Sequence, residues 1–134
     1  MNIIGIDAVT FGVKNLTKAK LFLSDWGLIN VKRGNFGADY ACTDGSEVKL
    51  RAQENRRLPP PIQAGSTVRE VTWGVQKKKD LKEIAKELSR DRPLRLNQDG
   101  SFSTTDDMGL GISFRVSKRK VLKPRPLLFN VPGN

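Results

Sequence analysis

The sequence predicts an α+β domain made of two tandem βαβββ modules, whose curved mixed sheets face each other around a cleft and carry their helices on the outside. The first observation is an internal repeat, because residues 8–13 (AVTFGV) match residues 70–75 (EVTWGV) at five of six positions when Phe and Trp count as equivalent. Both segments alternate β-branched or aromatic residues with others, which is typical of strands. The second observation is that the same order of predicted elements follows each segment.

An amphipathic helix is predicted after each repeated strand. In the first half, Asn15 or Thr17 can cap a helix over residues 18–26, which Gly27 can end. In the second half, Asp80 is the expected N-cap. The apolar positions are Ala19, Phe22, Leu23 and Trp26 in the first helix, and Leu81, Ile84, Ala85 and Leu88 in the second.

Strand candidates separated by turn sequences follow each helix. Asp44-Gly45 marks a turn in the first half, and Asp99-Gly100 is the strongest short hairpin signal in the second. Cys42 falls within a strand candidate and is expected to fill core space rather than act as a nucleophile. The candidates cover residues 29–33, 39–43 and 47–52 in the first half, and 94–98, 101–105 and 110–116 in the second.

One paired domain is expected over residues 1–116. Module one covers about 3–53, a proline-rich connection covers 54–66, and module two covers about 67–116. Each half alone is too small for a good core, so the two halves should pack together. Residues 117–134 are basic and contain prolines, which favours an extended tail or linker.

Composition excludes several classes of function. The chain has 24 Lys and Arg against 14 Asp and Glu, a net charge of +10, one Cys and no His. Catalysis through histidine, imidazole metal ligands, internal disulfides and cysteine-based zinc sites are therefore excluded. The positive charge favours an acidic partner. No segment approaches the roughly 20 apolar residues of a membrane span, and no secretory signal begins the chain, so we expect a cytoplasmic protein without a membrane partner.

Paired βαβββ modules that open on a strand like residues 6–13 (IDAVTFGV) resemble the glyoxalase/bleomycin-resistance/extradiol-dioxygenase superfamily, the vicinal oxygen chelate fold. Residues 106–114 (DDMGLGISF) are similar to its closing "D-P-x-G-x-x-I-E-F" strand. The resemblance spans residues 3 to about 116. It implies four metal-ligand positions, in the first and last strands of each module, which fall here on Ala8, Lys49, Glu70 and Ser113.

Only Glu70 among these four positions is a competent ligand for a divalent metal. Ala8 has no donor atom, Lys49 brings positive charge, and Ser113 is a weak neutral donor. A transition-metal site needs three or four donors. We therefore expect no metal, no cofactor and no catalytic residue in this chain. The possible cleft or ligand-binding residues are Lys49, Arg51, Glu70, Ser113 and Arg115.

Two interpretations of a metal-free cleft stay open. In one, Lys49 and Glu70 form an ion pair or face solvent. In the other, basic side chains bind an anionic small molecule, such as an aromatic or organic acid. Strand alternation weakens a role for Phe11 and Trp73 in that cleft, because it places them beneath the helices. The basic side chains considered for the anion are Lys49, Arg51, Arg69 and Arg115.

The resemblance implies the non-catalytic N-terminal domain of an extradiol ring-cleaving dioxygenase. Such enzymes commonly have two paired-module domains, of which the first has lost its metal residues. The whole protein would open a catechol-type ring with dioxygen, using Fe(II) in a downstream domain. This domain would support the catalytic one or form a homo-oligomer. The alternatives are a stand-alone binding protein for an anionic small molecule and, less favoured, a nucleic-acid-binding module that uses Lys77–79 and the basic tail.

Overall fold

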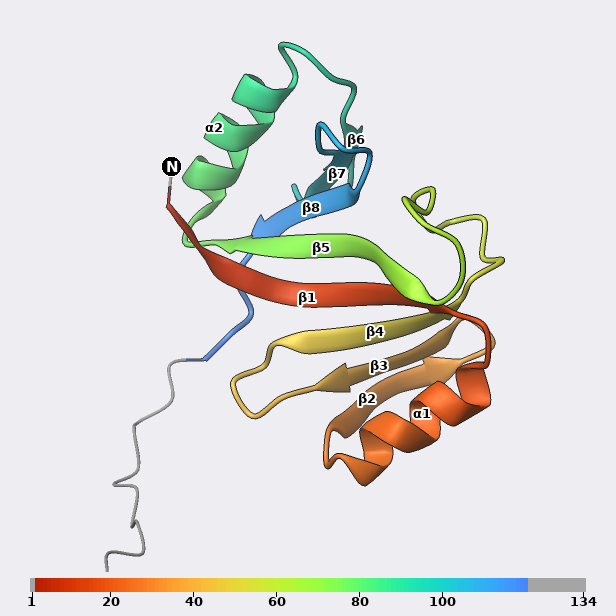
Figure 1. The fold of residues 1–134 in the computed structure, drawn as a ribbon. Coiled ribbons are helices and arrows are strands. Elements are labelled where there is room, and N and C mark those ends of the chain that lie inside the picture. The colour runs from red at the N-terminus through yellow and green to blue at the C-terminus, as the bar shows by residue number, and fades with distance from the viewer. Residues whose placement is uncertain (1, 121–134) are drawn as a thin grey trace, which may run out of the picture.

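Two long strands, β1 (Ile3–Val13) and β5 (Thr67–Val75), run antiparallel at the centre of a single eight-stranded sheet in the computed structural model, which describes residues 2–120. The strand order is β2-β3-β4-β1-β5-β8-β7-β6, and the sheet is open and curled (Figure 1). The other elements are α1 (Leu16–Asp25), β2 (Ile29–Gly34), β3 (Gly37–Ala41), β4 (Glu47–Ala52), α2 (Lys78–Leu88), β6 (Arg95–Leu96), β7 (Phe102–Thr105) and β8 (Gly111–Val116).

The two halves of the chain have the same strand arrangement. β1 pairs in parallel with β4, and β5 pairs in parallel with β8, while the outer strands of each half pair antiparallel. α1 contacts β3 and β4, and α2 contacts β5 and β8, so that the helices lie at opposite ends of the sheet (Figure 1). The predicted α+β class is confirmed, with the two half-sheets continuous across β1 and β5. That one ancestral unit was duplicated stays a prediction.

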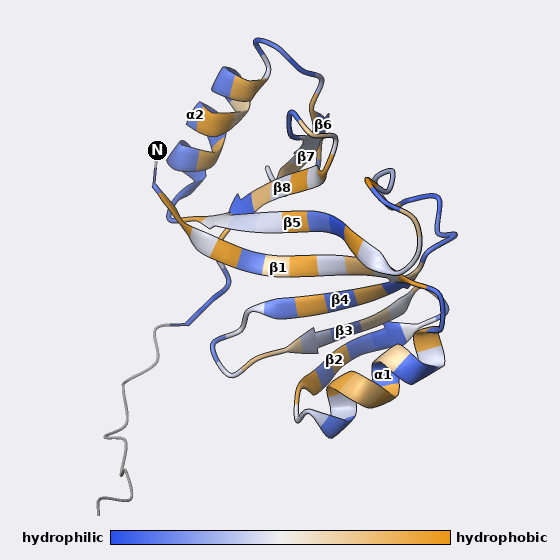
Figure 2. Cartoon of the chain, viewed as in Figure 1, coloured by the Kyte–Doolittle hydropathy of each residue, from blue (hydrophilic) through white to orange (hydrophobic). Residues whose placement is uncertain are grey.

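A hydrophobic cluster lies beneath each helix. Phe11 packs against the first cluster and Trp73 against the second, so both side chains face the helix-covered side, as strand alternation predicts. Figure 2 shows hydrophobic and hydrophilic residues alternating along the central strands. The buried members are Leu23, Ala38, Tyr40 and Leu50 beneath α1, and Val75, Leu81, Ile84, Phe102 and Phe114 beneath α2.

The two helices begin with different caps. Asn15 caps α1, since its side-chain Oδ1 accepts a hydrogen bond of 3.0 Å from the backbone N–H of Lys18. Gly27, with a φ of +93°, follows the end of this helix. The prediction that Asp80 caps α2 is wrong, because the helix begins earlier and its N-cap is Lys77. The Asp80 carboxylate instead reaches back to accept a hydrogen bond of 3.0 Å from the Lys77 N–H.

The predicted apolar face of α1 is partly wrong. Leu23 is buried, with Leu16 and Ala19 packed against the same cluster. Phe22 and Trp26 are 55% and 73% exposed, and their ring centroids lie 5.2 Å apart. The helix turns the stripe of positions 16, 19 and 23 toward the sheet, which leaves the two aromatic residues on a neighbouring face.

The expectation that Cys42 fills core space is also wrong. β3 ends at Ala41, and the Cys42 side chain is exposed. Its N–H donates to Ser46 O at 2.8 Å, and its carbonyl accepts from Gly45 N at 3.0 Å. The turn that contains Asp44-Gly45 therefore begins at Cys42 and removes this residue from the strand.

The hairpin in the second half is shorter than predicted. β6 covers only two residues of the candidate 94–98. The turn at Asp99-Gly100 is confirmed, because the Ser101 N–H donates to Asp99 Oδ1 at 2.9 Å and the Asn97 N–H donates to Ser101 O at 2.8 Å.

The segment after β8 is held against the sheet, in contrast to the extended tail expected from residue 117 onward. Ser117 N–H donates to Val75 O at 2.8 Å, and Lys120 N–H donates to Asp44 O at 2.6 Å. Residues 121–134, the rest of the predicted tail, lie outside the described residues. Between residues 2 and 120 neither helix is long and apolar enough to cross a membrane.

Candidate functional site

The side of the sheet away from the helices carries two rows of side chains that cross the central strands. In one row, Lys49 of β4 is in register with Thr10 of β1, which is in register with Glu70 of β5. In the adjacent row, Ala8 of β1 pairs with Thr72, and Thr72 pairs with Ser113. The four positions that the resemblance implies as metal ligands therefore lie in two neighbouring rows. We call this side the inner face.

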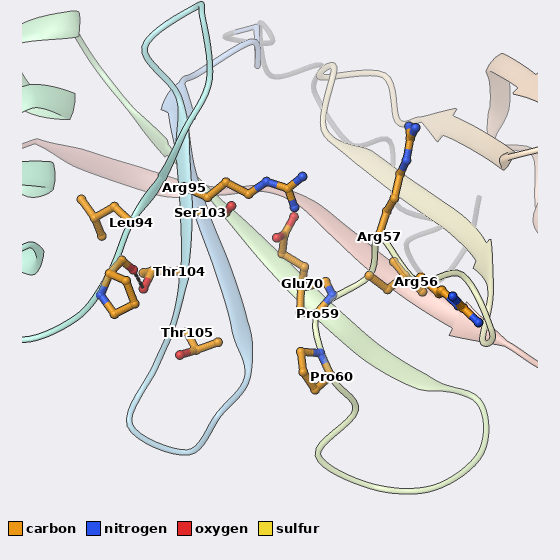
Figure 3. Close-up of a pocket in the computed structure, with 12 residues that line it drawn as sticks. Arg56, Arg57, Pro59, Pro60, Glu70, Leu94, Arg95, Ser103, Thr104 and Thr105 are labelled. Atoms are coloured by element: carbon orange, nitrogen blue, oxygen red, sulfur yellow. Dashed lines mark hydrogen bonds between the residues drawn. The ribbon is translucent and has the colours of Figure 1, made fainter.

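Three cavities adjoin this face, and Glu70 lines all of them. The first, of about 430 Å³, also has Arg95 in its wall, and Figure 3 shows the Arg95 guanidinium directed toward the Glu70 carboxylate. The second, of about 280 Å³, is lined by Lys49, Glu70, Ser113 and Arg115 among others. The third, of about 340 Å³, is lined by Lys49, Arg51 and Glu70. The structure thus brings all five predicted cleft residues to the cavities, whereas Ala8 is 1% exposed.

The connection between the halves crosses the inner face because Arg69 ties it down. A bulge in β5 at Arg69 interrupts strand alternation. The buried Arg69 guanidinium donates to Pro59 O at 2.7 Å and to Gln53 O at 3.0 Å. Pro59 approaches Gly111 so closely that a Cβ atom at that glycine would clash with the proline ring. Arg69, expected to offer charge to a ligand, instead fixes the connection, and Pro59 lines both the first and the third cavity.

Arg51 and Arg115 are both held by carboxylates. Arg51 Nη1 donates to Asp39 Oδ1 at 2.7 Å. Arg115 donates to Asp7 Oδ2 at 3.2 Å and to Glu47 Oε1 at 2.9 Å. These ion pairs place the two arginines firmly in the cavity walls. Their predicted role in binding an outside anion stays a prediction.

Lys49 and Glu70 form no ion pair with each other within residues 2–120, although both are half-buried on the same row. Burial lowers the pKa of the Lys49 ammonium, and the nearby charges of Glu47 and Asp39 only partly oppose this effect. Burial raises the pKa of the Glu70 carboxyl, against a long hydrogen bond of 3.4 Å from Ser113 and the charges of Lys49 and Arg95. The centre of the inner face therefore holds one acid and one base that are both poorly solvated.

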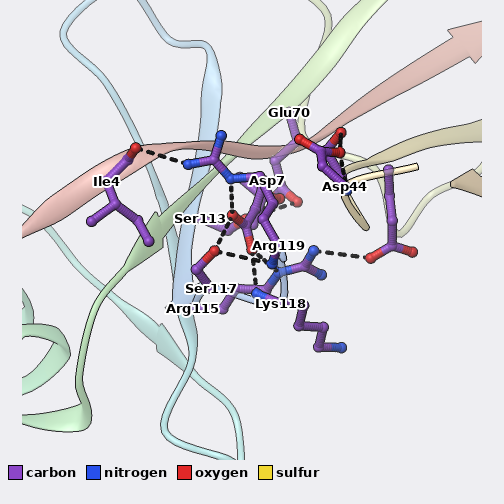
Figure 4. A network of polar contacts seen from close by, with 12 residues as sticks. Ile4, Asp7, Asp44, Glu70, Ser113, Arg115, Ser117, Lys118 and Arg119 are labelled. Atoms are coloured by element: carbon purple, nitrogen blue, oxygen red, sulfur yellow. Dashed lines mark hydrogen bonds and ion pairs between the residues drawn. The ribbon is translucent and has the colours of Figure 1, made fainter. Parts of the chain in front are cut away.

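Asp7 organises the end of the inner face, and sequence reasoning missed it. It is the extra residue of a bulge in β1, and its side chain is fully buried. Figure 4 shows Asp7 among donors from the segment after β8: Ser117 Oγ at 2.7 Å, Lys118 N at 2.9 Å and Arg119 Nε at 3.1 Å, besides Arg115. Burial raises the pKa of Asp7, but the hydrogen bonds together lower it by a larger amount. The pKa of Asp7 is therefore below its ordinary value. The available signal was an acidic residue inside an apolar strand.

The residues at the four ligand positions do not fit a divalent metal. They offer one carboxylate (Glu70), one hydroxyl (Ser113) and one cation (Lys49), and Ala8 offers no donor. The Ser113 hydroxyl is also engaged by Thr72 Oγ1 at 2.7 Å. Within residues 2–120 no group of three or more acidic or cysteine side chains could hold a metal ion. The absence of a metal from the protein stays a prediction.

Comparisons with known proteins identify the fold. No family model and no curated protein sequence matches the chain. Among solved structures, an extradiol ring-cleaving dioxygenase from B. fuscum matches with a TM-score of 0.70 and 12% identity over 87% of this chain. The Mn(II)-bound glyoxalase from Novosphingobium aromaticivorans matches with a TM-score of 0.64 and 16% identity over 92% of this chain. The chain has the vicinal oxygen chelate fold.

Both of these matching chains are longer than ours. Our chain spans 33% of the dioxygenase and 42% of the glyoxalase. A third solved structure, the NAD-dependent benzaldehyde dehydrogenase from Legionella pneumophila, matches with a TM-score of 0.53 and 21% identity over 83% of our chain and 98% of that chain. At these identities the likeness shows the fold alone. The same paired arrangement therefore occurs both within longer chains and as nearly a whole chain.

Proposed function

We propose that the chain is a non-catalytic vicinal-oxygen-chelate domain, corresponding to the N-terminal domain of an extradiol ring-cleaving dioxygenase. The observation that carries this proposal is the Lys49 ammonium at a ligand position, beside Glu70 as the single carboxylate of the four positions. A cation at this place repels a divalent metal and supplies no lone pair while it is protonated. The likeness to about a third of a dioxygenase chain supports the assignment to one domain of a larger protein.

The inner face is built to hold its shape without a central ion. Arg51 and Arg115 bind carboxylates of neighbouring strands, and Arg69 binds the connection. Among residues 2–120 no buried side-chain nitrogen or oxygen lacks a hydrogen-bond partner. In our proposal the domain supports a catalytic domain that holds Fe(II) and opens a catechol-type ring, either within one protein or through homo-oligomer contacts.

A metal titration with a designed positive control tests the proposal. Wild-type protein should show no change in melting temperature with Fe(II) or Mn(II), and dialysed protein should retain no stoichiometric metal. The triple variant Ala8→His, Lys49→His, Ser113→Glu keeps Glu70 and recreates a set of two imidazoles and two carboxylates. We expect metal to raise the melting temperature of this variant. Stoichiometric metal in the wild type, or catechol ring opening by this chain, would overturn the proposal.

The gene sequence after the codon for Asn134 tests the assignment to a larger protein. A second paired-module segment that contains histidines after the codon for Asn134 supports the dioxygenase assignment. A stop codon there contradicts it and favours a stand-alone protein.

A further inference from the structure

The third cavity of the inner face is strongly basic. It lies between the inner face and the connection, with a volume of about 340 Å³. Four cationic side chains line it, but the lining contains one carboxylate, Glu70, and burial raises the pKa of that carboxyl. The cations are Lys32, Lys49, Arg51 and Arg57. An anion that enters this cavity therefore meets an excess of positive charge.

Lys49 is a half-buried cation of this cavity that is free to meet such an anion. Within residues 2–120 its ammonium has no hydrogen-bond or salt-bridge partner. Of the carboxylates that interact with it electrostatically, Asp39 is engaged by Arg51 at 2.7 Å and Glu47 by Arg115 at 2.9 Å, while Glu70 forms no ion pair with it. A half-buried ammonium without an acceptor loses hydration and gains no compensating bond. An incoming carboxylate would supply that bond.

Beside the charged residues, Thr10 and Asn55 add polar groups to the wall of the cavity, and Phe36, Leu58 and Pro59 add aromatic and apolar ones. The Phe36 ring lies beneath the Arg51 guanidinium, at 4.8 Å from its centroid, and the Lys32 ammonium is 5.7 Å from the same centroid. Leu58 and Pro59 of the connection also line the cavity, and Arg69 holds that connection in place. A ligand with a small apolar body would contact these groups while its charged end meets Lys49.

We propose that this cavity binds a small organic carboxylate, with the carboxylate on Lys49 and the apolar body between Phe36 and Leu58. Arg57, at the connection, is the second cation that a carboxylate can reach by a side-chain rotation, because it forms no side-chain bond within residues 2–120. Arg51 stays with Asp39 and acts as part of the wall. This inference goes beyond the non-catalytic role proposed above and does not depend on a larger protein.

Isothermal titration of the whole chain with benzoate tests the charge requirement. Benzamide is the neutral comparison of nearly the same shape. We expect benzoate to bind at least tenfold more tightly than benzamide, because only the carboxylate brings a negative charge to the Lys49 ammonium, whereas the amide oxygen is a neutral acceptor. Equal affinities, or no measurable benzoate binding, would overturn the proposal.

Two substitutions in the cavity should shift the affinity in opposite directions. Lys49→Met keeps the length of the side chain and removes the ammonium, so benzoate binding should weaken by about tenfold or more. Glu70→Gln removes the single carboxylate of the lining, so benzoate should bind more tightly. The matched control is Lys86→Met on the exposed side of α2, which makes the same change in net charge. If this control weakens binding as much as Lys49→Met, general attraction by the basic chain explains the result and the proposal fails.

Lys49 also lines the second cavity, so the binding position needs its own measurement. In two-dimensional amide NMR spectra, benzoate should shift the signals of Phe36, Asn55 and Leu58, which adjoin the third cavity. Shifts confined to Asn97 and Ser101 would place the anion in the second cavity and overturn the proposal. The outcome is independent of the metal titration, so that failure of either proposal is recognised separately.

Discussion

Asp7 shows how one residue can join distant parts of a chain. Its carboxylate is fully buried, yet it accepts hydrogen bonds from Arg115, Ser117, Lys118 and Arg119. Burial alone would favour the neutral acid, but the donors stabilise the ionised form. β1 is thereby fastened to the segment that follows β8.

Replacing Asp7 with Asn should lower the free energy of unfolding by about 3 kcal/mol, because the arginines lose a buried counter-ion. Since the folded-state pKa is lowered, this stabilisation is present above the ordinary Asp pKa and is lost as the pH falls through the folded-state value. Urea titrations of wild type and variant should therefore converge in acid. Asp25→Asn, at an exposed position at the end of α1, is the control and should change stability little.

Glu70 should have the opposite dependence on pH. Its pKa is raised, so the folded state holds its proton to higher pH than the unfolded state does. Stability should therefore fall as the pH rises from the ordinary Glu value through the folded-state pKa, and this slope should be smaller in Glu70→Gln. With Lys49→Met added, we expect a gain on the order of 1 kcal/mol at neutral pH. If the double variant Lys49→Met, Glu70→Gln is less stable than the wild type, burial of these two charged side chains does not destabilise the fold as we infer.

At the scale of the elements, α1 carries apolar side chains that are buried and others that are exposed. Leu23→Ala should cost about 2–3 kcal/mol, since Leu23 is 9% exposed and fills the cluster beneath the helix. Trp26→Ala removes a larger side chain but should cost less than about 1 kcal/mol, because Trp26 is 73% exposed. Thermal unfolding of the two variants makes the comparison. Equal losses would show that Trp26 is covered in solution.

The close approach of the connection to β8 makes Gly111 sensitive to any side chain. Gly111→Ala would force Pro59 and the backbone of Arg69 away, at a cost of about 1–3 kcal/mol. Trypsin should then cleave faster at Arg56 and Arg57, which belong to that connection.

Gly34→Ala is the matched control for Gly111→Ala. At Gly34, in the edge strand β2, only the Phe36 ring approaches the new methyl group. Its tryptic cleavage rate should stay close to that of the wild type. Equal cleavage of the two variants would contradict a tight seat for the connection.

The elements were predictable from sequence where local patterns decide them. The strands at 8–13 and 70–75 alternate, and Asp99-Gly100 is a sufficient turn signal. Periodicity could not show which side of α1 the sheet covers, because Leu23 and Phe22 are both apolar neighbours. The site was predicted less completely. Strand alternation correctly placed its residues on one inner face. The Arg115–Asp7 pair could not be predicted, because it joins residues far apart in sequence. The bulges at Asp7 and Arg69 also interrupt the alternation from which the direction of a side chain is counted along a strand.

At the scale of the whole molecule, the charge of +10 opposes compaction. Raising NaCl from about 20 to about 200 mM should therefore increase the melting temperature, because it screens repulsion between exposed cations. Lys78→Gln with Lys79→Gln removes two exposed cations from the first turn of α2, where the helix dipole also disfavours them. This variant should melt higher at low salt and respond less to added salt. A wild type destabilised by salt would mean that its ion pairs outweigh the repulsion.

The bulges at Asp7 and Arg69 are single-residue insertions in the pairing between β1 and β5, which has a further register shift between Ile3 and Gly5. A strand that gains one residue ordinarily reverses the orientation of everything beyond it. Here the bulge accommodates the extra residue locally, so the side chains that follow it stay on the same faces of the sheet. A bulge thus adds a charged residue to a strand without changing the rest of its pairing. Deletion of Asp7 should release the segment after β8, and deletion of Arg69 should release the connection, while β1 and β5 stay paired.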